Sequence, residues 1–284
     1  FASEGPSAND PDTYPAETES DAYERASLSG RAGFALSDSV ELQAIGFMNA
    51  AETDLDLSFQ PNSQDRAEID EAGLAVQAAQ EAAEGGWAHT LTLSRYQADR
   101  RYFGTFNAPS GDLYEGVKDA ALYVANGRLS PTLDLAAGLN WEEERTRQTT
   151  LFSGVLEADL STAAAFAEAV LRPSTALSVT LAARLDDNSR FGMFDTYRAT
   201  AAYSLEPSWA GGAVKLRASY GTGAKAPGLY QLFDPSFGNR DLEAETSAGA
   251  DGVRPRSDQR DRFRSWAGAL RRLCAVRSHA GQRA

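Results

Sequence analysis

A strict alternation of apolar and polar residues is the feature that most constrains the fold of this chain. The clearest case is the segment 133–141, where every second residue is apolar: Leu133, Leu135, Ala137, Leu139 and Trp141. The same period of two recurs in residues 177–185, 197–205 and 214–220. Successive side chains point to opposite sides of a β-strand, so this period indicates strands with one apolar and one polar face.

Weaker alternation brings the predicted number of strands to about ten. The additional segments are 28–36, 40–48, 74–80, 87–95, 120–125 and 165–171. No run approaches the roughly 18 apolar residues of a membrane-spanning helix, and mean hydropathy is −0.40. A helical membrane protein is therefore excluded. A membrane β-barrel remains open, because its strands cross with about 9–11 residues and alternate in polarity.

The links between these strands alternate in length. Short, turn-like links lie at 37–39, 85–86, Asn126-Gly127, 172–174 and Pro207-Ser208. Long polar stretches lie at 48–69, 97–113, 142–155 and 186–195. Aromatic residues fall near predicted strand ends, at Trp87, Tyr96, Tyr102, Tyr123, Trp141, Tyr197 and Trp209. Short turns, long loops and aromatic girdles are the layout of an outer-membrane barrel.

Alternation alone leaves a soluble antiparallel sandwich or barrel as the alternative, because its strands alternate too. The membrane interpretation makes a specific prediction about the two faces. On the lipid side we expect Leu133, Leu135, Leu139, Leu177, Leu181, Leu216 and Tyr220. Towards a wet lumen we expect Asp134, Arg184, Arg198, Lys215 and Arg217.

Composition argues against several other functions. The net charge of −13 disfavours a nucleic-acid partner. Cys274 is the single cysteine, and His89 and His279 are the two histidines, so Cys- and His-based metal sites are not expected. His89 is a conceivable base for a hydrolase, but no nucleophile motif surrounds any serine, so we expect no catalytic residue.

Carboxylates in the predicted loops raise the question of calcium, which prefers oxygen ligands. The groups are Asp54, Asp56 and Asp65, then Asp99 and Asp112, then Asp186 and Asp187. None has the spacing of an EF-hand loop, and acidic loops are commonly solvated surface. We therefore expect no bound cofactor, with loop Ca²⁺ as the open alternative.

The last part of the strand region carries a family resemblance. Residues 217–247 read RASYGTGAKAPGLYQLFDPSFGNRDLEAETS, which is similar to a barrel segment of TonB-dependent outer-membrane receptors of the vitamin B12 and siderophore type. The family-motif positions are Tyr220, Gly221, Gly223, Lys225, Pro227, Leu229, Leu232, Asn239, Leu242 and Glu245. Ala224 and Ala244 depart from the motif, at positions where an aromatic residue and a proline are usual.

The motif residues have a structural interpretation. Gly221 and Gly223 allow a strand to bend or bulge near a barrel rim. Pro227 has no backbone N–H and should end the strand, and Lys225 is placed to snorkel or to pair with an acidic group. We therefore expect structural roles at these positions rather than catalysis or ligand binding.

The resemblance implies an all-β fold, an antiparallel transmembrane β-barrel present as a partial, open sheet. A plugged receptor barrel has about 22 strands, so about ten cover less than half of it. It also implies a place in the bacterial outer membrane, contact with its lipid, and a metal-chelate or cobalamin ligand. The TonB complex would be the energising partner, through a plug that nothing in this chain resembles. A porin-type channel, a surface binding protein and a soluble β-sandwich binding module are the alternatives.

Three regions are expected along the chain. Residues 1–22 form an acidic loop or a disordered start, and residues 23–247 form the partial barrel. Residues 248–284 hold three Asp and nine Arg and lose the alternation. We interpret that tail as the product of a reading-frame change, with no strand pairing to the sheet. A genuine basic extension is the alternative.

Overall fold

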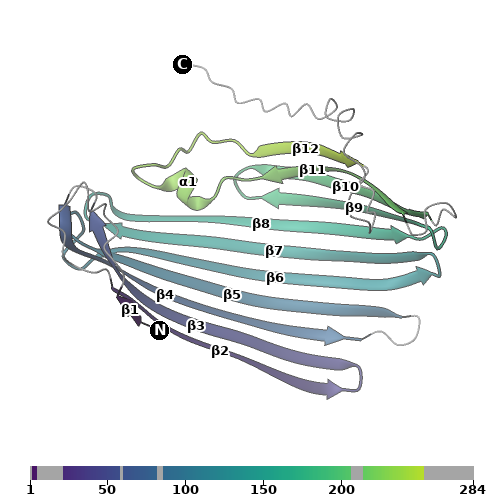
Figure 1. Cartoon of the computed structure of the whole chain (residues 1–284), viewed down its shortest axis with the longest axis horizontal. Coiled ribbons are helices and arrows are strands. Elements are labelled where there is room, and N and C mark those ends of the chain that lie inside the picture. Colours follow the sequence, from purple (N-terminus) through teal and green to yellow (C-terminus); the bar gives the residue numbers. More distant parts are fainter. Residues whose placement is uncertain (1, 5–21, 58–59, 82–85, 206–213, 253–284) are drawn as a thin grey trace, which may run out of the picture.

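The computed structural model describes residues 2–4, 22–57, 60–81, 86–205 and 214–252. These residues form one antiparallel sheet of twelve strands, and neighbours in the chain are neighbours in the sheet throughout. Figure 1 shows a curved, open sheet. The strands are β1 (Ala2–Glu4), β2 (Ala22–Ser37), β3 (Val40–Leu57), β4 (Gln60–Gln80), β5 (Trp87–Phe103), β6 (Asp112–Ser130), β7 (Leu133–Thr150), β8 (Gly154–Leu171), β9 (Leu177–Asn188), β10 (Gly192–Leu205), β11 (Val214–Lys225) and β12 (Glu245–Gly252). One five-residue helix, α1 (Leu229–Phe233), lies between β11 and β12.

The prediction of an all-β antiparallel sheet is confirmed. Each of the ten predicted segments lies inside its own strand, from β2 to β11. A soluble sandwich would give two packed sheets, whereas the described residues form a single one. Within the described part of the chain, no helix is long and apolar enough to cross a membrane.

The predicted long loops are wrong over much of their length. Strands β7 and β8 continue to Thr150 and from Gly154, so the stretch 142–155 is mostly paired backbone. The same holds at β9 and β10, which are joined by residues 189–191 alone. Gly154 and Gly192 follow these tight turns with φ of 67° and 72°. Such positive φ angles suit glycine, so the two glycines permit a tight connection where polar composition had indicated a loop.

The predicted turn at Asn126-Gly127 is also wrong. Both residues lie inside β6, where Gly127 is the register partner of Trp87. A Cβ atom at Gly127 would lie 2.9 Å from the Trp87 ring. The glycine therefore makes room for an aromatic ring on the neighbouring strand, and the chain turns later, at residues 131–132.

The two expected end regions differ from the structure as well. β12 extends to Gly252, so residues 248–252 pair with β11 and the expectation of an unpaired tail from residue 248 is wrong for them. Residues 253–284 lie outside the described part. At the other end β1 pairs with β2, and residues 5–21 of the expected acidic start lie outside the described residues.

The register confirms that the predicted lipid-facing and lumen-facing residues lie on opposite faces. Cross-strand partners share a face, and Trp141 is paired with Ala121 and Ala163. The leucines predicted to face lipid share the face of Trp141, whereas Arg184, Arg198 and Arg217 lie on the opposite face. We call the face on which α1 packs the inner face and the other the outer face. Contact of that face with lipid remains a prediction.

Side-chain exposure supports this naming. Along β9 the outer-face residues Leu181, Ala183 and Leu185 are exposed, while Ala182 and Arg184 between them are half-buried. Side chains converge on a concave face and spread apart on a convex one, which explains the difference. Along β7, β8 and β9 the inner face is therefore the concave one.

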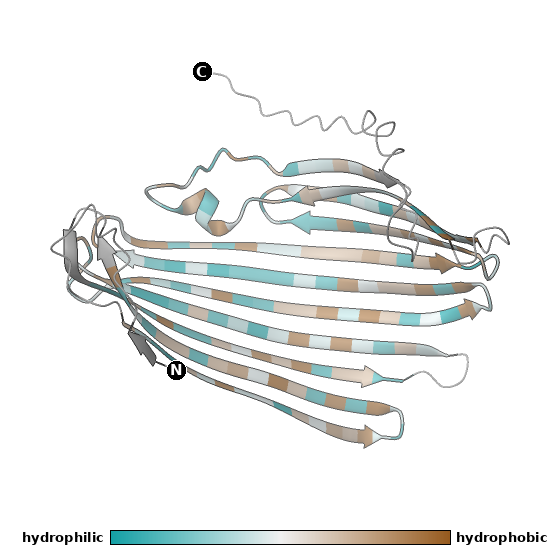
Figure 2. Cartoon of the chain, in the orientation of Figure 1, coloured by the Kyte–Doolittle hydropathy of each residue, from teal (hydrophilic) through white to brown (hydrophobic). Residues whose placement is uncertain are grey.

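Two zones follow one another along each long strand. One end of the strands carries the turns at residues 38–39, 131–132 and 172–176, and we call it the turn end. On the outer face, no Asp, Glu, Lys or Arg occurs in the segments nearest that end: 28–36, 40–48, 72–80, 87–93, 121–129, 133–141, 163–171, 177–185, 197–205 and 214–220. We call these outer-face residues the belt. Beyond it, at the α1 end, the outer face becomes charged, as at Glu143, Arg145 and Arg147 of β7. Figure 2 shows brown gathering towards the turn end and teal towards the α1 end.

The aromatic residues divide between the faces. Trp87, Tyr123, Trp141 and Tyr197 lie on the outer face, as a girdle requires. Tyr96 lies on the inner face instead, where its hydroxyl donates to Glu71 at 2.8 Å. Tyr102 shares that inner face, and Trp209 lies outside the described residues. The predicted girdle is therefore wrong for Tyr96 and Tyr102.

Candidate functional site on the inner face

Polar side chains from four neighbouring strands, β7 to β10, gather on the inner face at the α1 end of the sheet. They line a hollow formed by Asn140, Glu142, Thr162, Arg184, Asp186, Asn188, Phe194, Thr196, Gly223, Ala224 and Ala226. The hollow lies at the edge of the belt segments that faces α1, with Asn140 and Arg184 inside those segments and Thr162 and Thr196 just outside them. It combines a concave shape with charged groups.

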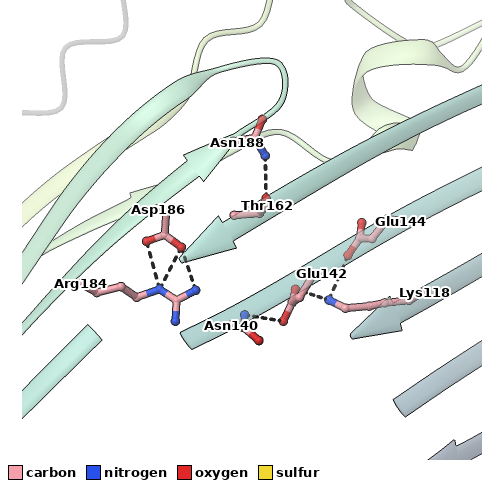
Figure 3. A network of polar contacts seen from close by, with 8 residues as sticks. All are labelled: Lys118, Asn140, Glu142, Glu144, Thr162, Arg184, Asp186 and Asn188. Atoms are coloured by element: carbon pink, nitrogen blue, oxygen red, sulfur yellow. Dashed lines mark hydrogen bonds and ion pairs between the residues drawn. The ribbon is translucent and has the colours of Figure 1, made fainter. Parts of the chain in front are cut away.

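A lysine between two glutamates holds one side of the site (Figure 3). The Lys118 ammonium lies 2.8 Å from Glu142 and 3.0 Å from Glu144, and Asn140 donates to Glu142 at 3.2 Å. The hydrogen bond from Lys118 lowers the pKa of Glu142 below its ordinary 4.5, against partial burial. Burial opposes the charge on Lys118, but the two glutamates outweigh it and raise the pKa of Lys118 above 10.5. Lys118 and Glu142 therefore stay charged at neutral pH.

The other side of the site is organised by Arg184 and Asn188. Arg184 donates to Asp186, with the Arg184 Nε 2.9 Å and 3.0 Å from the two carboxylate oxygens of Asp186. Asn188 donates to Thr162 at 2.9 Å, and its side-chain oxygen accepts from the backbone N–H groups of Arg190 and Phe191. Asn188 thus shapes the tight turn after β9 and ties it to β8.

Helix α1 packs on the inner face next to this network. Leu229 and Leu232 pack against Leu160 of β8 in the main buried apolar cluster, and Leu232 is 1% exposed. The N-terminus of the helix is closed locally, because the Gly228 N–H donates to the Gln231 side chain at 3.0 Å. Arg190 adds a second attachment by donating to the Arg240 backbone oxygen at 2.7 Å. The segment between β11 and β12 is therefore folded back against the inner face of the sheet.

The motif predicted from the sequence belongs to this fastened segment. β11 ends at Lys225, two residues before the buried Pro227. Proline has no backbone N–H to donate to a neighbouring strand, so the strand cannot continue through Pro227. Leu229 and Leu232 are the apolar anchors of α1. Asn239 forms the turn that follows, since its side chain accepts from the Asp241 N–H at 2.9 Å.

The remaining motif residues lie on β11 and β12. Tyr220 lies in the belt, 43% exposed, beside Tyr197 with ring centroids 6.0 Å apart. Gly221 and Gly223 follow on the inner face, where Ser247 comes within 2.9 Å of a Cβ built at Gly223. Lys225 and Glu245 are register partners of opposite charge at the end of the β11–β12 pair. Leu242 is 37% exposed in the preceding link.

The loop carboxylates considered for calcium have different surroundings. Asp112 accepts from Asn107, from the Ala108 N–H and from the Leu151 N–H, and Asp65 accepts from the Thr105 N–H. These two buried carboxylates therefore organise links at the α1 end. In the described residues no three acidic, histidine or cysteine side chains gather in a metal-like group.

His89 lies on the outer face, where its Nδ1 is 2.7 Å from the Tyr123 hydroxyl. This places it in the belt, away from the inner-face network.

The network residues Lys118, Asn140, Glu142 and Glu144 were not predicted from the sequence. One signal was available: Asn140, Glu142 and Glu144 continue the period of two begun by Asp134, so they had to share its face. Nothing local indicated that Lys118, more than twenty residues earlier, would lie opposite them.

Comparison with known proteins matches these features to one family. The family model described as TonB dependent receptor-like, beta-barrel matches residues 5–252. The vitamin B12 transporter BtuB of Vibrio cholerae serotype O1 is 34% identical over 116 residues, which cover 41% of this chain and 18% of that transporter. BtuB of Photobacterium profundum is 24% identical over 239 residues, covering 82% of this chain and 36% of the relative.

Solved structures share the fold. The siderophore receptor PirA from Acinetobacter baumannii superposes with a TM-score of 0.69 at 15% identity, covering 90% of this chain and 44% of PirA. The ferric enterobactin receptor PfeA from Pseudomonas aeruginosa gives 0.64 at 16% identity, covering 85% of this chain and 41% of PfeA. The chain thus spans less than half the length of these relatives.

Proposed function

This chain belongs to the β-barrel family of TonB-dependent receptors, and from that membership we propose that it forms part of the wall of an outer-membrane receptor that takes up a metal chelate or cobalamin. The family consists of outer-membrane proteins, and the named relatives are transporters and receptors. We assign a role in transport rather than catalysis on that basis.

One observation carries the proposal: the outer face is uncharged over the belt, while the inner face of the same strands is polar. Eight of the ten belt segments are nine residues long, close to the length that a tilted transmembrane strand needs, and the other two, 87–93 and 214–220, are seven residues long. A lipid-facing Arg or Lys near the bilayer midplane costs about 2–4 kcal/mol, which explains the absence of charge there. Polar inner faces line water in large membrane barrels, so the inner face provides the lumen wall.

The names of the relatives support the proposed ligand class. Two of them are named as vitamin B12 transporters, and the structural neighbours are named as receptors for siderophores and ferric enterobactin. Energised uptake would require the TonB complex, contacted through a plug domain. The strands described are barrel wall, so we place that contact outside them.

A porin-type channel and a surface binding protein are the alternatives, and an uptake experiment separates them. Cells lacking the gene for this chain would be compared with the parent and with complemented cells. They would receive radiolabelled cobalamin or radiolabelled ferric siderophore, with and without functional TonB. We expect the deletion to abolish TonB-dependent uptake of one of these ligands.

Loss of small-sugar permeability with unchanged uptake of both ligands would instead support a porin. Unchanged uptake and permeability, with loss of ligand binding at the cell surface, would support a surface binding protein.

A further inference from the structure

A groove runs along the outer face over β3, β4 and β5, at the edge of the belt that faces the α1 end. Two adjoining hollows form it, and both are lined by Met48, Ala72 and Gln97. Its floor is low because Gly46 and Ala72, on neighbouring strands, have little or no side chain. Met48 and Leu74 stand beside the floor, 64% and 55% exposed. All three strands are paired on both sides, so this part of the groove lies within the sheet.

The lining of the groove changes in a fixed order along the strands. Leu74, a belt residue, has Arg95 of β5 as its register partner. Four residues further towards the α1 end, Asp70 and Asp99 are register partners on the same two strands. The two levels are about 13 Å apart along a strand, and the long arginine side chain can shorten that gap. On leaving the belt, the groove therefore presents an apolar surface, then a cation, then two carboxylates.

Arg95 has donors to spare for a ligand. Its side chain is 59% exposed, and its guanidinium is 3.8 Å from Asp119 on β6. Asp119 is also bound from the other side by Arg145. An arginine carries several N–H donors in a planar fork, and phosphate oxygens accept from that fork in pairs. Arg95 can therefore bind a phosphate and keep its contact with Asp119.

The two carboxylates at the outer end of the groove favour a cation between them. Asp70 and Asp99 lie directly opposite each other, and like charges in that position destabilise a strand pair. Asp99 is held beside the groove, because Gln97 donates to it at 3.1 Å. Arg101, the next cation on this face of β5, has its stem against Gly111 instead. A primary ammonium between the carboxylates would donate N–H groups to both and offset their repulsion.

We propose that the groove binds one phospholipid with a phosphoethanolamine headgroup. An acyl chain lies over Gly46 and Ala72, the phosphate binds Arg95, and the ammonium lies between Asp70 and Asp99. Such a lipid carries acyl chain, phosphate and ammonium in the order in which the groove presents its apolar, cationic and anionic groups. This inference rests on the proposed position of the belt in the bilayer and adds a specific lipid site to it.

The charges also distinguish this lipid from other phospholipids. A glycerol headgroup brings no cation to the carboxylates at the outer end. A choline headgroup brings a cation, but its quaternary nitrogen has no N–H to donate. Both lipids still present a phosphate to Arg95, so they should bind more weakly than the ethanolamine lipid and not be excluded.

Lipid retention by the full-length protein tests the headgroup. The protein is equilibrated with equal amounts of phosphatidylethanolamine, phosphatidylcholine and phosphatidylglycerol that carry identical acyl chains. Native mass spectrometry then measures the complexes that retain a single lipid. We expect the ethanolamine lipid to be retained about fivefold more than the choline lipid, as one charge-assisted contact would give. Equal retention of the three lipids, or a preference for phosphatidylglycerol, would overturn the assignment.

Charge variants assign the two parts of the headgroup. Asp70→Asn combined with Asp99→Asn should remove the preference for ethanolamine over choline. Arg95→Gln should instead lower retention of all three lipids by about threefold, and Arg95→Lys should recover part of it. Arg66→Gln is the matched control, because Arg66 lies on the same face of β4 beyond the groove. A preference that survives loss of both carboxylates would show that they do not bind the ammonium.

A steric variant locates the bound lipid. Ala72→Phe fills the floor of the groove and should reduce preferential retention of the ethanolamine lipid to that of the choline lipid. Ala78→Phe adds the same ring to the same face of the same strand, deeper in the belt, and should leave the preference unchanged. Loss in both variants, or in neither, would place the lipid outside the groove and overturn the site.

The lipid site and the receptor function fail in different ways. If cells take up a chelate or cobalamin while the protein retains the three lipids equally, the lipid site is wrong and the receptor function stands. If cells take up none of these ligands while Ala72→Phe still abolishes a preference for the ethanolamine lipid, the lipid site stands and the uptake function fails.

Discussion

The two zones of β7 show how one strand is built for two environments. Residues 133–141 and 142–150 are equally well paired with β6 and β8, so the backbone does not distinguish them. They differ on the outer face, which carries Leu139 and Trp141 in the first zone and Glu143, Arg145 and Arg147 in the second. Backbone hydrogen bonds therefore set the length of the strand, and outer-face chemistry sets the part that we assign to the bilayer.

A charge placed in the belt should have the largest effect on stability. Leu139, 60% exposed on the outer face, is changed to Arg. We expect a loss of about 2–4 kcal/mol in the free energy of unfolding in lipid vesicles, because an arginine at mid-bilayer must lose its hydration. Urea titration of the full chain measures it.

Ala136→Arg on the inner face of the same strand is the matched control and should cost much less. Equal losses at the two positions would show that the belt does not face lipid.

The attachment of α1 to the second zone gives the next largest effect. Leu232→Ala removes a side chain that is 1% exposed, and should destabilise the segment by about 2–3 kcal/mol, since the cluster around it is small. Amide hydrogen exchange in residues 228–234 should rise accordingly.

Tyr230→Ala, at a position 56% exposed in the same helix, should leave that exchange nearly unchanged. Similar exchange in both variants would mean that α1 is not held by its buried leucines.

Glycines in the first zone give an intermediate effect. A Cβ at Gly138 would lie 2.4 Å from the Phe166 ring and 2.5 Å from the Tyr123 backbone oxygen. Gly138→Ala should therefore cost about 1–3 kcal/mol by overpacking, measured by the same urea titration. Gly30→Ala, where nothing lies within 4 Å, should be close to neutral. A neutral Gly138→Ala would show that Phe166 moves freely away from its partner strand.

The smallest effect is expected from the charged network of the second zone. Glu142→Gln should cost less than about 1 kcal/mol at neutral pH, because the Lys118 and Glu142 side chains are 39% and 36% exposed and solvent screens them.

The pH dependence has a defined sign. The pKa of Glu142 is lowered in the fold, so its contribution is present above 4.5 and is lost as pH falls through the lower folded value. Lys118 has a raised pKa, so its contribution is present below 10.5 and is lost as pH rises through the higher folded value. Acid titration of stability should be shallower in Glu142→Gln than in the parent. Identical acid titrations of the parent and Glu142→Gln would show that the Lys118–Glu142 ion pair does not contribute to stability.

Much of the fold was accessible from the sequence because it depends on local chemistry. Period-two segments located ten strands, and Pro227 located the end of β11. The positions at which the strands end could not be predicted from the sequence. Residues 142–150 are polar on both faces, so alternation gives no signal there, although their backbone pairs with both neighbours.

The candidate site was less accessible than the fold. Lys118 meets Glu142 and Glu144 because β6 and β7 pair in one register, and a shift of one residue would turn Lys118 to the opposite face. The bulge between Arg128 and Ser130 and the turn at 131–132 set that register.

The sequence by itself determined which side chains share a face, because successive residues of a strand point to opposite sides whatever their neighbours are. It also determined that the alternating segments are β-strands with one mainly apolar and one mainly polar face. Tertiary structure alone decided which face is concave, that α1 folds onto it beside Leu160, and that Lys118 lies between Glu142 and Glu144. These features depend on register and curvature, which are properties of paired strands and cannot be predicted from the sequence of a single strand.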